Sequence, residues 1–305
     1  MRISTNTIYQ NGISRISDLQ SEQSKLQQQI STGRRILTPA DDPVGASHAL
    51  EIQQAQSVNS QYAANRVAAQ RNLGIEESTL SSVTDLIVSV QSTMVSAGNA
   101  ALSDTERGYL ATQLQGSLDE LIGLANSKDG AGAYMFAGYQ TATQPFVKII
   151  TGAQYLGDAG QRLVQVDASR QMAVADTGDS VFQGNGQDVF KTMTDLITLL
   201  QTPTPTPADK AALTAGLVAA DTGMQAALDS VLTTRAMVGS RLNELDALDV
   251  FGQSRDLQYA QTLSETQDLD YAKALSQVSQ QQTILTAAQK SFVAITSLSL
   301  FDFIR

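Results

Sequence analysis

The sequence predicts a mainly α-helical protein with a small β-rich insert, whose long N- and C-terminal helices pack as a coiled-coil-like bundle. Three observations support this fold class. Both ends carry apolar residues at seven-residue spacing, and the middle of the chain holds short apolar runs separated by glycine. The composition is also that of packed helices, because Ala, Gln, Ser, Thr and Leu dominate and only 5% of the residues are aromatic.

The first predicted helix carries its heptad pattern over residues 12–37. The pattern has one row at Ile16, Gln23, Ile30 and Leu37, and a second row at Gly12, Leu19, Leu26 and Gly33. Glutamines fill several positions between the rows, and glutamine is a good helix former without charge. The segment from Leu37 to Pro43 predicts the end of this helix. Pro43 is suited to the first position of the next helix, with Asp42 as its N-cap.

Two more helices are predicted before the insert. One runs from Pro43 to about Met94, and the other begins at a cap formed by Ser103 or Asp104. The second of these ends near Asp129–Gly130. It presents leucines on one face at spacings of three and four, namely Leu110, Leu114, Leu118, Leu121 and Leu124.

The sequence pattern changes from helical to strand-like between Tyr134 and about Phe182. Phe146–Ile150 and Arg162–Val166 are predicted strands, and the glycine-containing segments between and after them are predicted turns. Helical patterns return over Val189–Leu200 and from about residue 208 to 249. Alternating Thr and Pro over residues 202–207 predict an extended connector between these two helices.

The last helix is predicted from about Arg255 to the end, and it has the longest stripe. One row is Leu257, Ser264, Tyr271, Val278, Leu285 and Phe292, and the other is Ala260, Gln267, Ala274, Gln281, Ala288 and Ile295. A helix with such a face needs a partner, because most helical stability comes from burying that face. We expect the two ends to pair with each other.

This order of elements predicts five segments. They are an N-terminal helix (1–40), the first part of an inner helical domain (41–132), a β-rich insert (133–187), the second part of the inner domain (188–252) and a C-terminal helix (253–305).

Composition narrows the functions open to the chain. The formal net charge is -10 and the pI is about 4.5, so nucleic acid and anionic membranes are repelled on average. The chain has no Cys, which excludes disulfides and thiolate chemistry. Arg2 is followed by Ser4 and Thr5 rather than an apolar segment, so no cleaved secretory signal is predicted. We expect a cytoplasmic protein, or one exported by a route that needs no such signal.

Candidate chemical sites are few. His48 is the only histidine and is interpreted as a surface residue. Asp41 and Asp42 form an adjacent acid pair that favours helix capping over cation binding. Gly130–Gly132 and Gly184–Gly186 lack the context of a phosphate loop, and Arg34–Arg35 is too short for a nucleic-acid patch. The sequence therefore predicts no enzyme, cofactor or metal site.

The stripes of the two ends remain as the strongest functional feature. Charges are sparse after Leu257, where Gln and Ser stand at positions that usually carry Glu and Lys in a solvated coiled coil. Such faces suit packing against several identical neighbours, although an ordinary coiled coil within a soluble protein stays an alternative. The predicted assembly interface comprises Ile16, Leu19, Leu26, Ile30, Leu37, Leu257, Tyr271, Val278, Leu285, Phe292 and Ile295.

Several blocks resemble a known family. Ile30–Ile36 and the block Pro39–Ala46 are similar to the N-terminal block of the bacterial flagellin superfamily. Three further segments resemble the members that form the junction of hook and filament rather than the filament itself. These segments are Met1–Thr5, Leu298–Phe303, and Tyr134–Tyr139 with Thr143, Pro145 and Phe146.

This resemblance implies flagellin-like nested domains and a structural role. The expected assembly is a ring of identical subunits, with a hook-associated junction protein on the hook side and flagellin on the filament side. The resemblance also implies export through the flagellar type III apparatus and an export chaperone on the C-terminal helix, with Val278, Leu285 and Phe292 as its contacts. A filament flagellin is the alternative within the family, and a cytoplasmic coiled-coil adaptor is the alternative outside it.

Overall fold

The computed structural model describes residues 5–297, so the resemblance at Leu298–Phe303 and most of that at Met1–Thr5 lie outside the described residues. The chain divides into two compact units, which are described separately. The first unit comprises residues 1–58 and 254–305, and the second comprises residues 59–253. Two long helices, α2 (Pro43–Ala97) and α6 (Pro207–Gln267), contribute residues to both units.

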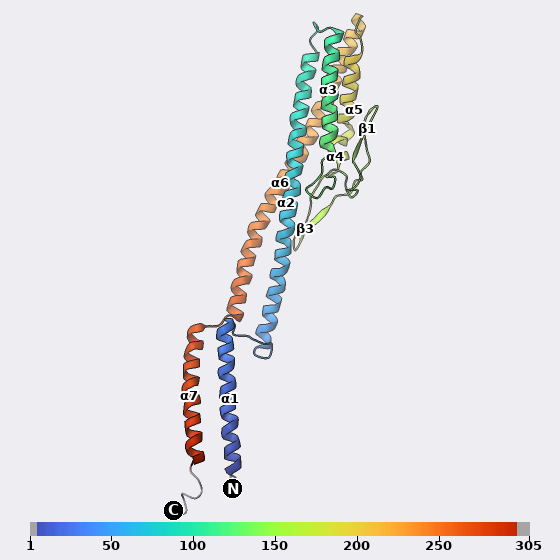
Figure 1. The fold of residues 1–305 in the computed structure, drawn as a ribbon. Helices are drawn as coiled ribbons and strands as arrows, with labels where there is room; N and C mark the ends of the chain where they lie inside the picture. The colour runs from blue at the N-terminus through green and yellow to red at the C-terminus, as the bar shows by residue number, and fades with distance from the viewer. Residues whose placement is uncertain (1–4, 298–305) are drawn as a thin grey trace, which may run out of the picture. The chain divides into compact units, whose positions relative to one another are not determined.

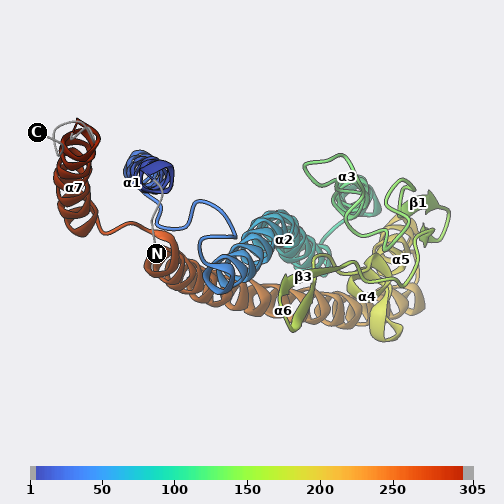
Figure 2. The ribbon, with the colours of Figure 1, turned by 90° about the horizontal axis from the view of Figure 1, so that it is seen from below.

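In the first unit, helix α1 (Thr5–Thr32) packs along helix α7 (Tyr271–Ser297). The two helices run in opposite directions, and both views show them side by side (Figures 1 and 2). The predicted pairing of the two ends is therefore confirmed. So is the fold class, a mainly α-helical chain with small antiparallel sheets.

Helix α1 ends earlier than its heptad pattern predicts. The pattern continues to Leu37, but the helix stops at Thr32 because Gly33 has a φ of 71°, a left-handed conformation that closes a helix. Leu37 consequently lies in the turn between α1 and α2, half-buried and outside both helices.

The prediction of one C-terminal helix from about Arg255 to the end is wrong. Helix α6 continues without interruption through residues 249–255 to Gln267, and the chain breaks at Asp268–Asp270 before α7. No strong helix breaker stands between 249 and 255, since Gly252 is tolerated where the Arg66 side chain packs against it. At the true break, the side chain of Asp270 accepts a hydrogen bond from Lys273 N and so caps α7.

The second unit is a helical bundle flanked by two β-hairpins (Figure 1). Helix α3 (Asp104–Ala125) packs on α5 (Val189–Gln201), and both share one apolar core with α2 and α6. Ser103 caps α3 in a full capping box with Glu106, as the sequence predicts. Helix α3 ends at Ala125 rather than near Gly130, because Lys128 and Tyr134 form a short bridge across the turn that follows.

The hairpins come from strands β1 (Phe146–Ile149) with β2 (Gly152–Tyr155), and β3 (Leu163–Asp167) with β4 (Arg170–Ala173). Each forms its own two-stranded antiparallel sheet. The short helices α4 (Gly178–Phe182) and η1 (Gly184–Gly186) follow. The first hairpin is anchored by a cluster of buried phenylalanine rings with centroids 4.9–5.8 Å apart, Phe136, Phe146, Phe182 and Phe190.

The Thr-Pro connector is extended, as predicted, and hydrogen bonds also hold it against the start of α3. Thr204 is buried, and its backbone N–H and hydroxyl lie 3.3 and 3.2 Å from Asp104 Oδ1 at the start of α3. The buried guanidinium of Arg107 hydrogen-bonds both Asp104 and Thr204. The connector is therefore a fixed part of the bundle.

Candidate assembly interface

The predicted row on α1 forms the contact face with α7. Gly12, Gln23 and Gly33 are half-buried, and so are the large apolar members of the row, Ile16, Leu19, Leu26 and Ile30. Apart from Gln29, which is half-buried, the residues between them on α1 are exposed. The heptad pattern thus identifies the buried face of α1 correctly, although the partner that buries it is the chain's own C-terminal helix.

The matching row on α7 lies in the same seam. Ala274 is buried, and Val278, Gln281, Leu285, Ala288 and Phe292 are half-buried. Polar and aromatic contacts join the two rows. Gln281 Nε2 donates to Glu22 Oε2 at 3.0 Å, and the rings of Tyr9 and Phe292 lie 5.2 Å apart.

Three of the predicted interface residues remain largely exposed. Leu257 lies on α6 rather than on the last helix and is 72% exposed, while Tyr271 and Ile295 are 50% and 57% exposed. The sequence reasoning missed other exposed apolar residues of α7, which lie on the two flanks of the seam: Leu275 and Val293 on one flank and Ile284 on the other. Leu275, Ile284 and Val293 are 58%, 43% and 64% exposed, and they fall outside the heptad rows that were used to define the stripe.

A backbone clasp joins the two ends where the helix pair begins. Arg34 and Asp268 form an antiparallel bridge, Arg35 N donates to Gln267 O at 2.7 Å, and Leu269 N donates to Gly33 O at 2.9 Å. The guanidinium of Arg35 also reaches Thr266 O at 2.8 Å. Both residues of the Arg34–Arg35 pair therefore take part in the clasp.

In the acid pair that follows the clasp, Asp42 caps a helix, as predicted, whereas Asp41 binds groups of the turn and Lys25. Asp42 Oδ1 accepts from Gly45 N at 2.9 Å and so caps α2, while Asp42 Oδ2 binds Arg35. The Gly45 N–H and then Arg35 lower the pKa of Asp42. Asp41 binds Lys25 at 2.6 Å, and this bond, followed by the Thr38 N–H, lowers the pKa of Asp41 to about 2.

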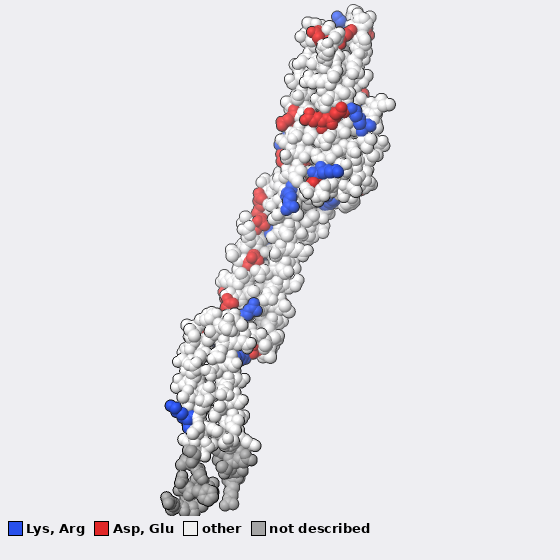
Figure 3. Space-filling view, in the orientation of Figure 1, with Lys and Arg blue, Asp and Glu red and all other residues white. Residues whose placement is uncertain are grey.

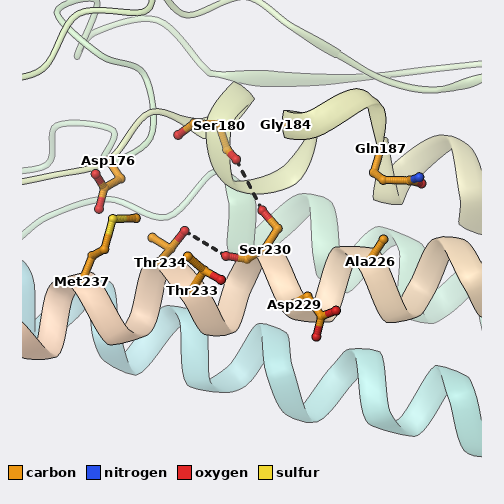
Figure 4. A pocket seen from close by; sticks show the side chains of 10 residues that line it. All are labelled: Asp176, Ser180, Gly184, Gln187, Ala226, Asp229, Ser230, Thr233, Thr234 and Met237. Carbon is orange, nitrogen blue, oxygen red and sulfur yellow. Dashed lines mark hydrogen bonds between the residues drawn. The ribbon is translucent and has the colours of Figure 1, made fainter.

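The second unit holds a hollow of about 400 Å³ between α6 and the segment that carries α4 and η1 (Figure 4). Several of its polar groups have partners within the fold. Ser230 Oγ donates to Val181 O, Thr234 Oγ1 donates to Ser230 O, and Asp176 pairs with Arg241. We find no hydrogen-bonded nucleophile and base among these lining residues.

Other candidate sites are also accounted for by the fold. His48 is exposed, 3.8 Å from Glu51. Within residues 5–297, no group of three or more acidic or histidine side chains is arranged to hold a metal ion. In the same range, none of the helices is both long and apolar enough to cross a bilayer.

Comparison with known proteins identifies the class. Residues 3–141 match the family model described as the bacterial flagellin N-terminal helical region. Among solved structures, a flagellar hook-associated protein from Vibrio parahaemolyticus superposes with a TM-score of 0.68 at 23% identity, covering 75% of this chain and 100% of that one. The flagellar junction protein of Legionella pneumophila gives 0.61 at 21% identity, covering 74% and 100%. The fold is that of a flagellin-type subunit.

The particular family follows from a full-length relative. Flagellar hook-associated protein 3 of Escherichia coli strain K12 is 40% identical over 316 aligned residues, which cover 99% of each chain. The chain therefore belongs to the flagellar hook-associated protein 3 family. It is a structural component of the flagellar junction, which associates with hook and filament components, and the alternative of a filament flagellin is set aside.

Proposed function

We propose that the chain forms a ring of identical subunits between a hook-associated junction protein and the flagellin filament. In this proposal residues 1–40 and 253–305 build the inner tube of the ring. Residues 41–132 and 188–252 form the inner helical domain around that tube, and residues 133–187 form the outer insert.

The observation that carries the proposal is the exposed apolar residues on the two flanks of α7, on either side of its seam with α1. Helix α7 already packs on α1, yet Leu275, Ile284 and Val293 remain exposed on it. Only Lys273 and Lys290 are charged among the residues of this helix. In the view of Figure 3, the surface over α1 and α7 is almost entirely white, whereas charged groups are spread along the helices of the second unit.

Physical chemistry favours identical neighbours as the molecules that cover these flanks. Fully burying a large apolar side chain contributes roughly 1.5–3 kcal/mol, so a few such residues per subunit stabilise a closed ring appreciably. Because α7 carries so few charges, copies of the same helix can approach one another with little electrostatic repulsion. A helix that had to stay solvated would carry Glu and Lys at these positions.

We further propose that the chain has no catalytic activity. The support is that Ser230 in the lining of the hollow holds α6 to α4, that Asp176 is paired with Arg241, and that no nucleophile hydrogen-bonded to a base stands among the lining residues. Assembly is then the function of the whole chain.

For export, we propose passage through the flagellar type III apparatus with a chaperone bound to α7. The predicted chaperone contacts Val278, Leu285 and Phe292 lie in the seam with α1. A chaperone that binds these side chains must therefore replace α1, and the helix pair closes only after the chaperone leaves. The same side chains would be covered at each stage, first by the chaperone and then by α1.

The proposal is tested by Leu275→Glu combined with Ile284→Glu. Both residues are exposed and lie on opposite flanks of α7 outside the seam rows, so the fold is retained while each flank gains a charge. Cells that lack the native protein and carry this variant are expected to secrete it into the medium, to show bare hooks by electron microscopy and to shed flagellin.

The matched control places the same two changes on the insert, at the exposed residues Val147 and Ile150. Filaments should attach normally in that strain. Normal filaments in the Leu275→Glu, Ile284→Glu strain would contradict the proposal. Measuring the secreted variant separates a failure of export from a failure of assembly.

A further inference from the structure

The seam between α1 and α7 pairs glycines with aromatic rings at both of its ends. A Cβ atom on Gly12 would lie 2.5 Å from Cδ2 of Phe292, and one on Gly33 would lie 2.9 Å from the hydroxyl oxygen of Tyr271. The two glycines are three heptads apart on the α1 side, and the two rings are three heptads apart on α7. Because the helices are antiparallel, both contacts belong to a single register.

That register places residues of complementary size opposite each other along the whole seam. Counting inward from the two glycine contacts pairs Ile16 with Ala288, Leu19 with Leu285, Leu26 with Val278, and Ile30 with Ala274. All of these residues are half-buried or buried, as the pairing requires. Large residues therefore meet small or medium ones in most layers.

The central layer pairs two glutamines, Gln23 with Gln281. The hydrogen bond from Gln281 Nε2 to Glu22 lies at this level, which supports the counted register. The other amide atom, Gln281 Oε1, is buried without a hydrogen-bond partner within the described residues. A polar layer of this kind lowers stability, but it specifies register in coiled coils.

Heptad spacing alone would leave the register open, because sliding one helix by seven residues keeps the apolar rows facing each other. In one direction such a slip puts Phe292 against Leu19 and Gln281 against Ile30. In the other direction it puts Tyr271 against Leu26 and Gln281 against Ile16. Each slip crowds a ring against a large side chain and buries an amide against an apolar one, and both changes are unfavourable.

We propose that Gly12 and Gly33 are sockets for Phe292 and Tyr271, and that the sockets together with the Gln23–Gln281 layer specify the register of the terminal helix pair. Gly12 stands inside a helix, where glycine is less favourable than alanine by about 1 kcal/mol, so a packing role accounts for it. The register decides which α7 residues face outward. It is a property of the pair itself and is tested without assembly of the ring.

The absence of cysteine from the natural sequence makes disulfide trapping a clean test. Full-length protein with Leu19→Cys and Leu285→Cys reports the proposed register, and Leu26→Cys with Leu285→Cys reports a slip of one heptad. With the seam otherwise unaltered, the first pair should cross-link at least about tenfold faster, which corresponds to a register preference of about 1.4 kcal/mol.

Removing both rings, by Tyr271→Ala with Phe292→Ala, should bring the ratio of the two rates towards one. The control is Leu275→Ala with Ile284→Ala, which removes two exposed side chains from the same helix and should keep the ratio. An equal ratio in the ring variant and the control would overturn the proposal. So would equal rates for the two cysteine pairs in the unaltered seam.

A second set of variants exchanges the glycine and the ring between α1 and α7. It keeps the proposal testable if the two helices come apart in the variant that lacks both rings. Gly12→Phe alone should lower the in-register rate, because two rings then compete for one layer. Adding Phe292→Gly moves the socket to α7 and should restore the rate. If the exchange restores nothing, complementary size does not set the register and the proposal is wrong.

Discussion

Glu76 provides a sharp test of the second unit, because it is a fully buried acid on α2. Its Oε1 accepts a hydrogen bond from Asp176 N at 3.0 Å, and its Oε2 is buried without a hydrogen-bond partner within the described residues. Burial and then the negative charge of Asp176 raise the pKa of Glu76 to about 8. The Asp176 N–H and the charges of Arg241 and Arg162 oppose this shift without cancelling it. Glu76 is therefore protonated in the folded chain at neutral pH.

The raised pKa makes stability depend on pH in a defined direction. Between about pH 4.5 and about pH 8 the unfolded chain releases the Glu76 proton while the folded chain keeps it, so the free energy of unfolding falls as the pH rises. Each pH unit is equivalent to about 1.4 kcal/mol, so this one group lowers stability by roughly 5 kcal/mol over the whole window. Below and above the window its effect is constant.

The measurement compares the full-length protein with Glu76→Gln by urea denaturation at about pH 5 and about pH 8, followed by circular dichroism. The stability of the native protein relative to the variant should fall by several kcal/mol between the two pH values. Glu77→Gln is the control, because it removes an acid from the neighbouring, partly exposed position and leaves Glu76 in place. Equal pH slopes for the native protein and Glu76→Gln would refute the reasoning.

Two further predictions concern the same unit. Phe146→Ala empties the centre of the phenylalanine cluster and should lower the free energy of unfolding by about 3–5 kcal/mol in the same denaturation assay, whereas Val147→Ala on the exposed face of β1 should change it by well under half of that amount. Ser103→Ala removes the side-chain cap of α3 and should cost about 1 kcal/mol, with hydrogen exchange rising first in the opening turn of α3; a change spread evenly over α3 would contradict a capping role.

The seam between α1 and α7 was predictable from the sequence, because residues that recur every seven positions lie on one face of a helix and that face is the one that becomes buried. The rows on α1 with Gly12, Gln23 and Gly33 emerge as one half-buried face, and the rows on α7 match them. A seven-residue repeat identifies such a face whatever covers it. The pattern did not identify what covers it, and the predicted interface residues Leu19, Leu26 and Leu285 turned out to be covered by the chain itself.

Helix ends were less predictable, because they depend on contacts far away in the sequence. The break at Asp268–Asp270 coincides with backbone hydrogen bonds from Leu269 N to Gly33 O and from Arg35 N to Gln267 O. The sequence of either segment alone does not indicate these bonds. Strand β2, by contrast, lacks the β-branched residues that mark strands, and it forms because β1 pairs with it across a tight turn. Strand β4 was missed for the same reason.

The exposed flanks of α7 show why the site itself needed the structure. A heptad interpretation assigns one stripe to each helix, and it had already assigned that stripe to Val278, Leu285 and Phe292. Leu275 and Ile284 lie on opposite flanks of that stripe, and they become visible as uncovered apolar residues only when α1 is seen to occupy the stripe itself.

The seam face and the flanks of α7 therefore impose different requirements on the chain. The seam face is satisfied within one subunit, and we infer that it selects the partner helix and its register. The flanks that carry Leu275 and Ile284 stay exposed within the described residues of the subunit, and these apolar side chains gain burial only when another molecule supplies it. If the seam fixes the register first, Leu275 and Ile284 are presented at defined positions before any neighbour arrives. Ordering of the terminal pair and assembly of the ring are then successive steps that depend on different residues of the same helix, which is why the proposed tests alter the seam and the flanks separately.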